Sequence, residues 1–210
     1  MTPVQTVLVI AKQPVPGRVK TRLIGPCSAE QAAELAEQAI HDTLAALADF
    51  PCQDKVILLD GELAPPPGWR VVPQSGNGLD ERLVAGFEAV VSGPAVLVGM
   101  DTPQLSSEVL AFDHRGYDAC LGLAADGGFW AIGFTDPAQA RPCILGVPMS
   151  TPETGAEQRR RLDEAGLRVQ PLPVLIDVDT AASAEAVART APHTRFARTW
   201  RAMRPAEASA

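Results

Sequence analysis

The sequence predicts an α/β fold with a mostly parallel, mixed central sheet that helices cover on both faces. Apolar segments of strand length alternate with alanine- and leucine-rich segments of helical periodicity along most of the 210 residues. Val7–Ile10 is wholly apolar, and a continuous apolar run is typical of a strand buried on both faces. Pro94–Asp101 contains the strongest candidate for a central strand. A hydrophobic content of 46% is enough for a sizeable core. We expect one domain over residues 1–204 and a disordered tail at 205–210.

The first half of the chain is expected to contain three strands and two helices. Ser28 and Gln31 have the spacing of an N-terminal capping box, which places a helix start there. Three consecutive prolines between the second and third strands indicate a loop. The expected elements, in order, are a strand at Val7–Ile10, a helix from Ser28 to near Asp49, strands at Lys55–Asp60 and Trp69–Pro73, and a helix from Leu79 to near Val91.

The second half is expected to continue the alternation. The strand in Pro94–Asp101 ends before Pro103, because proline cannot continue a ladder. The strands on either side of the turn at Asp126 form either an antiparallel hairpin or a bent continuation. After Pro94–Asp101 we expect a short helix near Ser106–Phe112, strands at Tyr117–Leu123 and Phe129–Phe134, an irregular segment at 135–151, a helix at Pro152–Ala165, an extended segment at Arg168–Ile176, and helical segments at Ser183–Thr190 and Phe196–Met203.

Composition argues against several classes of function. A formal net charge of -7 and an isoelectric point near 5.0 make non-specific binding to nucleic acid or to an anionic membrane unexpected. The chain has no apolar run of about 18 residues, the length that spans a bilayer, and its N-terminus lacks the pattern of a signal peptide. The four cysteines are widely spaced, which fits buried thiols better than a zinc site or a disulfide framework. We therefore expect a cytoplasmic protein.

A cluster of cations follows the first expected strand. Lys12, Arg18, Lys20 and Arg22 lie within eleven residues that also contain the glycine turn at Gly17, although the protein as a whole is acidic. A glycine-containing turn after a first strand is a common phosphate-binding element, since backbone N–H groups and cations converge there. The alternative is a solvated basic loop. We favour a phosphate ligand.

Carboxylates follow the later strands. Asp101, Asp126 and the pair Asp177/Asp179 each come at a strand end or a tight turn. In an open α/β sheet such ends meet at one edge, where ligands bind. Carboxylates beside a phosphate-binding loop are reasonable if Mg²⁺ or Mn²⁺ bridges them, because magnesium takes one or two carboxylates and completes its shell with phosphate and water. Each aspartate alone also fits a turn or a helix cap.

Other catalytic classes have weak support in this sequence. There is no G-x-S-x-G nucleophile elbow, no G-x-x-x-x-G-K-[ST] loop and no G-x-G-x-x-G fingerprint. His41, His114 and His193 are isolated in the sequence, which is typical of core or surface residues and not of a metal site. Trp130 follows the turn at Asp126 and fits the core better than a substrate platform.

Four motifs occur together in this order: Ala11–Leu23, Gly99–Leu105, Asp126–Gly133 and Asp177–Thr180. With these motifs the chain resembles, over about residues 5–185, the radical-SAM/selenodomain-associated transferase family, a domain of unknown function within the nucleotide-diphospho-sugar transferase superfamily. It is also similar to the phospholactate and molybdopterin guanylyltransferases. The resemblance implies a Rossmann-like α/β/α sandwich of GT-A type, a nucleotide substrate and magnesium.

The resemblance also implies roles for residues. Asp101 and Asp179 would bind the metal, and Lys20, Asp101 and Asp126 would be catalytic. The residues implied in nucleotide binding are Ala11, Lys12, Gly17, Arg18, Lys20, Arg22 and Gln74. Leu79–Arg82 corresponds to a stretch of the family that contacts base or acceptor. Met149 stands where the family usually has tryptophan, and this changes the shape expected on the acceptor side.

Three functions remain open from the sequence. The favoured one is magnesium-dependent nucleotidyl transfer from a nucleoside triphosphate to a small acceptor, with release of pyrophosphate. Glycosyl transfer from a nucleotide-diphospho-sugar is a close second, and non-catalytic nucleotide binding is third. Four cations suit a triphosphate better than a diphosphate, and Gly99–Asp101 has one carboxylate where many glycosyltransferases have Asp-x-Asp. The acceptor, the base and the oligomeric state are not indicated.

Overall fold

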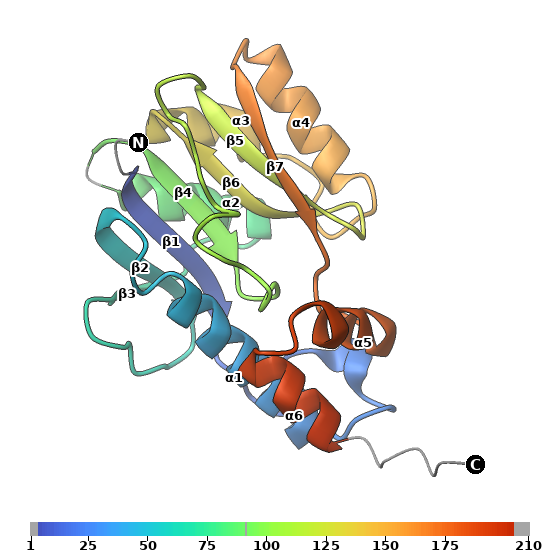
Figure 1. Cartoon of the computed structure of the whole chain (residues 1–210). Coiled ribbons are helices and arrows are strands. Elements are labelled where there is room, and N and C mark those ends of the chain that lie inside the picture. The colour runs from blue at the N-terminus through green and yellow to red at the C-terminus, as the bar shows by residue number, and fades with distance from the viewer. Residues whose placement is uncertain (1–3, 91, 204–210) are drawn as a thin grey trace.

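A central sheet of seven strands organises the chain in the computed structural model, which describes residues 4–90 and 92–203 (Figure 1). The strand order across the sheet is β3-β2-β1-β4-β6-β5-β7. The strands are β1 (Val4–Lys12), β2 (Cys52–Asp60), β3 (Arg70–Pro73), β4 (Ala95–Gly99), β5 (Ala119–Ala124), β6 (Phe129–Phe134) and β7 (Val169–Leu175). The disordered tail expected at 205–210 lies outside the described residues.

The sheet is mixed and mostly parallel, as predicted. β1 pairs in parallel with both β2 and β4, and β5 pairs in parallel with β7. β6 is antiparallel to both of its neighbours, β4 and β5. Of the two arrangements open from the sequence, the strands around Asp126 therefore form an antiparallel hairpin. One consequence matters for function: β1, β2, β4, β5 and β7 all end at the same edge of the sheet.

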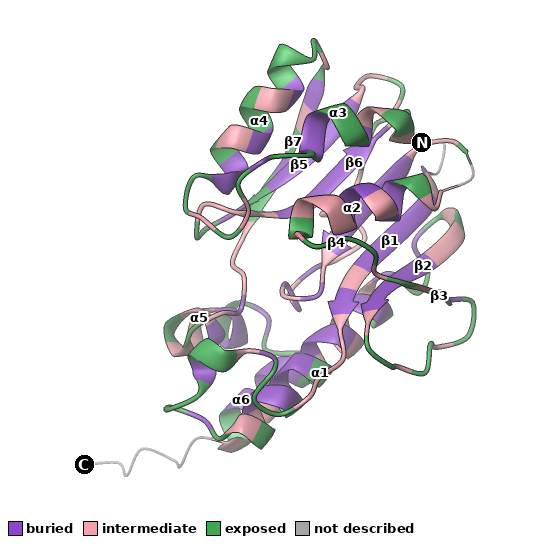
Figure 2. Cartoon of the chain, turned by 180° about the vertical axis from the view of Figure 1, so that it is seen from behind, coloured by how far each residue is buried: buried purple, intermediate pink, exposed green. Residues whose placement is uncertain are grey.

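Helices cover both faces of the sheet. They are α1 (Ala29–Ala46), α2 (Leu79–Glu88), α3 (Ala140–Ile144), α4 (Thr154–Glu164), α5 (Ala181–Thr190) and α6 (Arg195–Met203), with 3-10 turns η1 (Thr21–Leu23) and η2 (Pro137–Gln139). On β1, Val7 and Val9 pack into the core that includes α1, whereas Leu8 packs into the core that includes α2, α3 and α4. This alternation follows from the two-residue period of a strand, and it makes β1 buried on both faces (Figure 2).

Capping residues begin two of the helices. Ser28 and Gln31 form the predicted capping box at the start of α1, and Thr180 with Ser183 forms a second one at α5. α1 ends at Ala46, earlier than the sequence suggests. Beyond the carboxyl edge of the sheet, α1, α5 and α6 pack around a third core that includes Leu35, Val187 and Trp200 (Figure 1).

The sequence-based expectations were wrong in two segments. Residues 106–112 form turns and not a helix. Leu110 N donates a hydrogen bond to Ser106 O at 3.3 Å, but Ala111 N donates to Glu108 O, so a helical ladder does not continue. Residues 135–151 are not wholly irregular, since they contain η2 and α3. The side chain of Asp136 accepts a hydrogen bond from Ala138 N at 3.1 Å and starts this segment, which is too short to show a helical period in sequence.

The two outermost strands of the sheet, each with one side unpaired within it, are β3 and β7. β7 contains Pro171 and Pro173, both exposed, and Val174 is 63% exposed. The indole of Trp130 donates a hydrogen bond to the carbonyl of Pro173 at 3.0 Å, and Trp130 is a core residue, as expected. None of the helices in the described residues is long and apolar enough to cross a bilayer.

Candidate active site

The cationic loop, residues 12–22, begins where β1 ends and turns back toward the sheet. Val15, Pro16, Gly17 and Arg18 form a turn closed by a 3.0 Å hydrogen bond from Arg18 N to Val15 O. Gly17 has φ 75°, a conformation that favours glycine after proline in a type II turn. Arg18 is exposed, and the next residue, Val19, is buried. The turn thus directs the chain after it inward.

Lys20 is a deeply buried cation of this loop, and it lies against Asp101. Its ammonium lies 2.5 Å from Asp101 Oδ1, and it donates a hydrogen bond to the carbonyl of Val178. The Lys20 side chain is only 5% exposed, whereas that of Asp101 is 41% exposed. Asp101 follows β4 and Val178 follows β7, so this one ammonium connects three segments at the sheet edge. The loop and Asp101 therefore lie together at the carboxyl ends of the strands, where the strand order places both.

Arg22 and Asp179 form a second ion pair beside the first. The Arg22 side chain is 68% exposed, so this pair is much more open to solvent than Lys20. The backbone N–H of Asp179 donates a hydrogen bond to Ser183 Oγ at 2.9 Å, within the cap of α5. Asp179 therefore precedes the cap residue Thr180, and its carboxylate is directed to the cationic loop instead of capping the helix.

Asp177 is a residue of this site that the sequence marks only as a candidate carboxylate, together with Asp179, and to which it assigns no role. Its Oδ1 is buried and has no hydrogen-bond partner among the described residues. Burial raises the pKa of Asp177 to about 7, and the charges of Asp101, Asp126 and Asp179 add to this, while Lys20 opposes it. These four aspartates, which we call the acidic group, are therefore close enough to interact. The available signal was the position of Asp177 two residues after the end of β7.

Asp126 belongs to the acidic group through the tight turn between β5 and β6. Its Oδ1 accepts a hydrogen bond from Gly128 N at 2.9 Å, and the residue is exposed. Gly127 has φ 94°, and a Cβ there would lie 2.0 Å from the carbonyl oxygen of Pro152. Gly155 N, at the start of α4, donates to Gly127 O at 2.7 Å. The turn that presents Asp126 is thus held against α4, and only glycine fits its middle position.

On the other side of β1, Lys12 and Arg82 both approach Asp60. Each has a nitrogen 3.8 Å from Asp60 Oδ2, a loose ion pair at the end of β2. Gln74 fixes this region, because its Nε2 donates to Ala11 O at 2.7 Å and to Leu58 O at 3.1 Å. Lys12 and Arg82 remain partly exposed toward solvent.

The predicted site residues therefore lie at one sheet edge in two halves. The backbone N–H of Lys12 lies 3.2 Å from Met100 Sδ, which joins the end of β1 to the end of β4 and so connects the halves. The acidic half contains Lys20, Arg22 and the acidic group, and the other half contains Lys12, Gln74 and Arg82. Gly17 and Arg18 are exposed on the loop after β1.

The donor set suits a hard divalent cation. Asp101 Oδ1 and Asp177 Oδ1 are buried without a hydrogen bond, and the Lys20 ammonium contacts Asp101 only as an ion pair. Carboxylate and carbonyl oxygens are the ligands that Mg²⁺ and Mn²⁺ take. Among the described residues no group of three or more His, Cys, Asp or Glu side chains is arranged as a preformed metal site. A magnesium ion that binds together with phosphate does not need such a group, since one or two carboxylates suffice.

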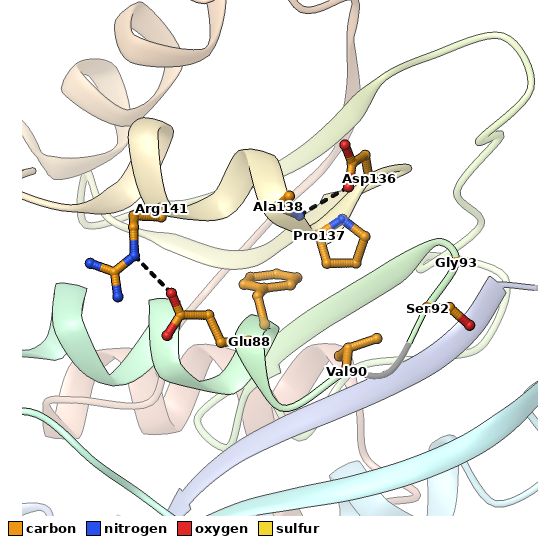
Figure 3. Close-up of a pocket in the computed structure, with 9 residues that line it drawn as sticks. Glu88, Val90, Ser92, Gly93, Asp136, Pro137, Ala138 and Arg141 are labelled. Atoms are coloured by element: carbon orange, nitrogen blue, oxygen red, sulfur yellow. Dashed lines mark hydrogen bonds and ion pairs between the residues drawn. The ribbon is translucent and has the colours of Figure 1, made fainter.

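A hollow of about 560 Å³ lies elsewhere, at the edge where β4 begins (Figure 3). Glu88 of α2 and Arg141 of α3 line it and form an ion pair at 2.7 Å, and Val90 and Asp136 also form part of its wall. Glu88 and Arg141 neutralise each other, and the acidic group lies at the opposite edge of the sheet. The hollow is therefore separate from the candidate site.

The chain belongs to the family DUF2064, described as an uncharacterized protein conserved in bacteria, whose model matches residues 32–151. The matched range contains Asp101 and Asp126, whereas the cationic loop and Asp179 lie outside it. The fold, with β6 antiparallel in an otherwise parallel sheet, is of GT-A type, as its likeness to a solved structure shows. No curated protein sequence matches the chain.

Several solved structures share the fold. A protein from Desulfovibrio desulfuricans G20, itself provisionally assigned as a nucleotide-diphospho-sugar transferase, is 27% identical with a TM-score of 0.83, covering 94% of this chain and 92% of that one. A nucleotidyl transferase from Methanothermobacter thermautotrophicus gives 15% identity and a TM-score of 0.58 over 93% and 99% of the two chains. The 2-C-methyl-D-erythritol 4-phosphate cytidylyltransferase of Thermus thermophilus gives 14% identity and a TM-score of 0.55 over 90% of this chain and 99% of that one. At the two lower identities the likeness concerns the fold alone.

Proposed function

We propose that this protein is a divalent-cation-dependent transferase that acts on an activated nucleotide, and that it transfers a nucleotidyl group from a nucleoside triphosphate to a small acceptor. The observation that supports this most directly is the meeting of the cationic loop with the acidic group at the carboxyl edge of the sheet, through Lys20 and Asp101 at 2.5 Å. The solved structures of this fold include nucleotidyl and cytidylyl transferases, which agrees with the proposal.

In the proposed reaction an acceptor oxygen forms a bond to the α-phosphorus of the triphosphate; it is either a phosphate oxygen or a hydroxyl oxygen that gives its proton to water. The bond from that phosphorus to the oxygen of the β-phosphate breaks, and pyrophosphate leaves with the electron pair. Lys12, Arg18, Lys20 and Arg22 bind phosphate oxygens and stabilise their growing charge, so the chain acts mainly by positioning and electrostatics. Asp101 and Asp179 would hold Mg²⁺ or Mn²⁺, which would supply further positive charge to the phosphates. Asp126 lies at the same edge, where it orients the acceptor.

Glycosyl transfer from a nucleotide-diphospho-sugar is the second candidate. The likeness to the Desulfovibrio desulfuricans protein, at 27% identity and a TM-score of 0.83, favours it. Against it stand the four loop cations, which exceed the need of a diphosphate, and the single carboxylate in Gly99–Asp101. The two reactions differ in their products, because only nucleotidyl transfer releases pyrophosphate.

Thermal-shift measurements with each nucleoside triphosphate and with common nucleotide-sugars, with and without Mg²⁺, identify the class that binds. Release of pyrophosphate in the presence of phosphorylated or hydroxylated small acceptors then separates the two reactions. Asp101→Ala and Lys20→Ala are expected to abolish metal-supported nucleotide binding in calorimetry, whereas Lys55→Ala, which changes a lysine on the amino half of β2, is the matched control. Undiminished binding in both site variants would refute the site assignment.

A further inference from the structure

Lys20 differs from the other loop cations in where its charge lies. The Lys20 side chain is 5% exposed, while those of Lys12 and Arg22 are 45% and 68% exposed. A phosphate group approaching from solvent therefore meets Lys12 and Arg22 directly, but it does not meet the Lys20 ammonium. The role of Lys20 as a phosphate ligand requires that its side chain first leave its present position.

The present neighbours of the Lys20 ammonium are oxygens that suit a metal ion. They are Asp101 Oδ1 at 2.5 Å and the carbonyl oxygen of Val178, and the charge of Lys20 also acts on Asp177. Asp101 Oδ1 and Asp177 Oδ1 are buried and have no hydrogen bond within the described residues. An ammonium is a compact, hard point charge, and it can stand where a hydrated divalent cation would otherwise be held by the same oxygens.

The backbone directs Lys20 into this position. Lys20 has φ 48° and ψ 38°, a left-handed conformation that is uncommon for a residue with a side chain. Val19 before it and Leu23 after it are both anchored in the core, at 6% and 0% exposure. The lysine side chain is long and has several rotatable bonds, so the ammonium can move out while the backbone keeps its place.

We propose that the Lys20 ammonium is an internal occupant of the cation position, and that a divalent cation and Lys20 bind Asp101 in mutually exclusive states. Cation binding displaces the ammonium from Asp101 and Val178, and the released side chain reaches the phosphates of the bound nucleotide. Binding of cation and of nucleotide is then coupled, because the cation frees the group that the nucleotide uses. The inference rests on the proposed function for its nucleotide half only.

The first test measures binding of Mn²⁺ alone, by electron paramagnetic resonance of the free ion, to the full chain without nucleotide. Lys20→Met keeps the length and the apolar contacts of the side chain but removes its charge. We expect this variant to bind Mn²⁺ about tenfold or more tightly than the wild type, since the substitution removes a positive charge that lies within a few ångströms of the cation position and repels the ion. Lys55→Met, the matched control, should leave the affinity unchanged, and Asp101→Asn should abolish the binding. Equal or weaker affinity in Lys20→Met would overturn the proposal.

A second test uses the wild-type protein and does not depend on the folding of any variant. The chain has three lysines, Lys12, Lys20 and Lys55, so amine acetylation at each can be followed by mass spectrometry. Lys20 should react slowly in the metal-free protein and severalfold faster when Mg²⁺ alone is added, while the rate at Lys55 stays constant. A Lys20 rate that Mg²⁺ does not change would contradict the exchange.

The outcomes for this inference and for the proposed function are separable. If Mn²⁺ binding and Lys20 acetylation respond as expected but no nucleotide binds, the exchange stands and the proposed function fails. If pyrophosphate is released with Mg²⁺ while Lys20 stays protected and Lys20→Met gains no affinity for Mn²⁺, the proposed function stands and the exchange is refuted.

Discussion

Asp177→Asn should stabilise the metal-free protein at neutral and alkaline pH. The carboxylate of Asp177 is mostly buried beside three other aspartates, and its pKa is raised from the ordinary 3.8 to about 7. At about 1.4 kcal/mol for each pH unit, that difference corresponds to roughly 4 kcal/mol of stability lost when Asp177 must ionise in the folded state. Asparagine has the same shape and carries no charge. We expect a gain of about 2–4 kcal/mol at most, because relaxation of the exposed neighbours reduces the effect.

The sign of the pH dependence follows from which state binds the proton. Below the ordinary pKa of 3.8, Asp177 is protonated in both the folded and the unfolded chain, so the variant and the wild type should be equally stable. Between pH 3.8 and about 7 the unfolded chain has lost the proton and the folded chain has kept it, so the free energy of unfolding of the wild type decreases progressively relative to that of the variant. Above about 7 both states are ionised, and the difference stays constant.

Urea unfolding monitored by circular dichroism, in the presence of a chelator, measures this difference across the pH range. Asp136→Asn is unsuitable as a control because Asp136 caps η2, whereas Asp49→Asn changes an exposed aspartate beyond α1 and is suitable. An Asp177→Asn protein that is no more stable than the wild type at alkaline pH would show that the acidic group is not strained. It would also remove the electrostatic reason for a cation at this edge.

Three further predictions concern the elements that support the site. Gly127→Ala should destabilise the protein by about 3 kcal/mol or more in urea unfolding, because its Cβ would lie 2.0 Å from Pro152 O at a φ of 94°. Gly17→Ala, with a φ of 75° but open space around it, should cost only about 1 kcal/mol. Similar costs for the two variants would refute the close packing of the turn on α4. Arg168→Met should return the pKa of Asp118 from about 2 toward 3.8 in an NMR titration, since the Arg168 guanidinium donates a hydrogen bond to that carboxylate. In the wild type this pair contributes stability that is present above pH 3.8 and is lost as the pH falls through about 2. An unchanged Asp118 titration in the variant would contradict this cause. Phe87→Ala should lower the free energy of unfolding by about 3–5 kcal/mol, because Phe87 is 1% exposed and packs edge-on against Phe134 with ring centroids 5.2 Å apart. Val71→Ala, at a residue that is 37% exposed, should lower it by less than about 1 kcal/mol. Comparable losses of stability would argue against the packing of α2 on the sheet.

The fold was largely predictable because its signals are local. The segment Val7–Ala11 of β1 and the whole of β4 are apolar, as is typical of strands buried on both faces. Ser28 with Gln31 marks the start of α1 by hydrogen bonds within one turn. The turns at 106–112 were not predictable in this way. Their conformation is determined by Leu110 and Phe112, which pack into a core formed by distant parts of the chain.

The candidate site was predictable in its residue types and place, but not in its electrostatics. Strand ends predict that Lys20, Asp101 and Asp179 share one edge, since parallel strands end together. Whether a given carboxylate is buried depends on the path of the chain after β7, where Val178 inserts into a core and leaves Asp177 beside Asp101. Sequence spacing cannot distinguish Asp177 from Asp179, because the difference arises from tertiary packing.

The prolines of β7 have a consequence for how the protein behaves in concentrated solution. An edge strand exposes unpaired N–H and C=O groups that can pair with another sheet. Pro171 and Pro173 have no N–H group, and because they are two residues apart they remove donors from the same side of the strand. Since β5 occupies the other side of β7, the missing donors are those of the free edge. A strand as apolar as β7 thus ends the sheet without offering a continuous ladder to a second molecule.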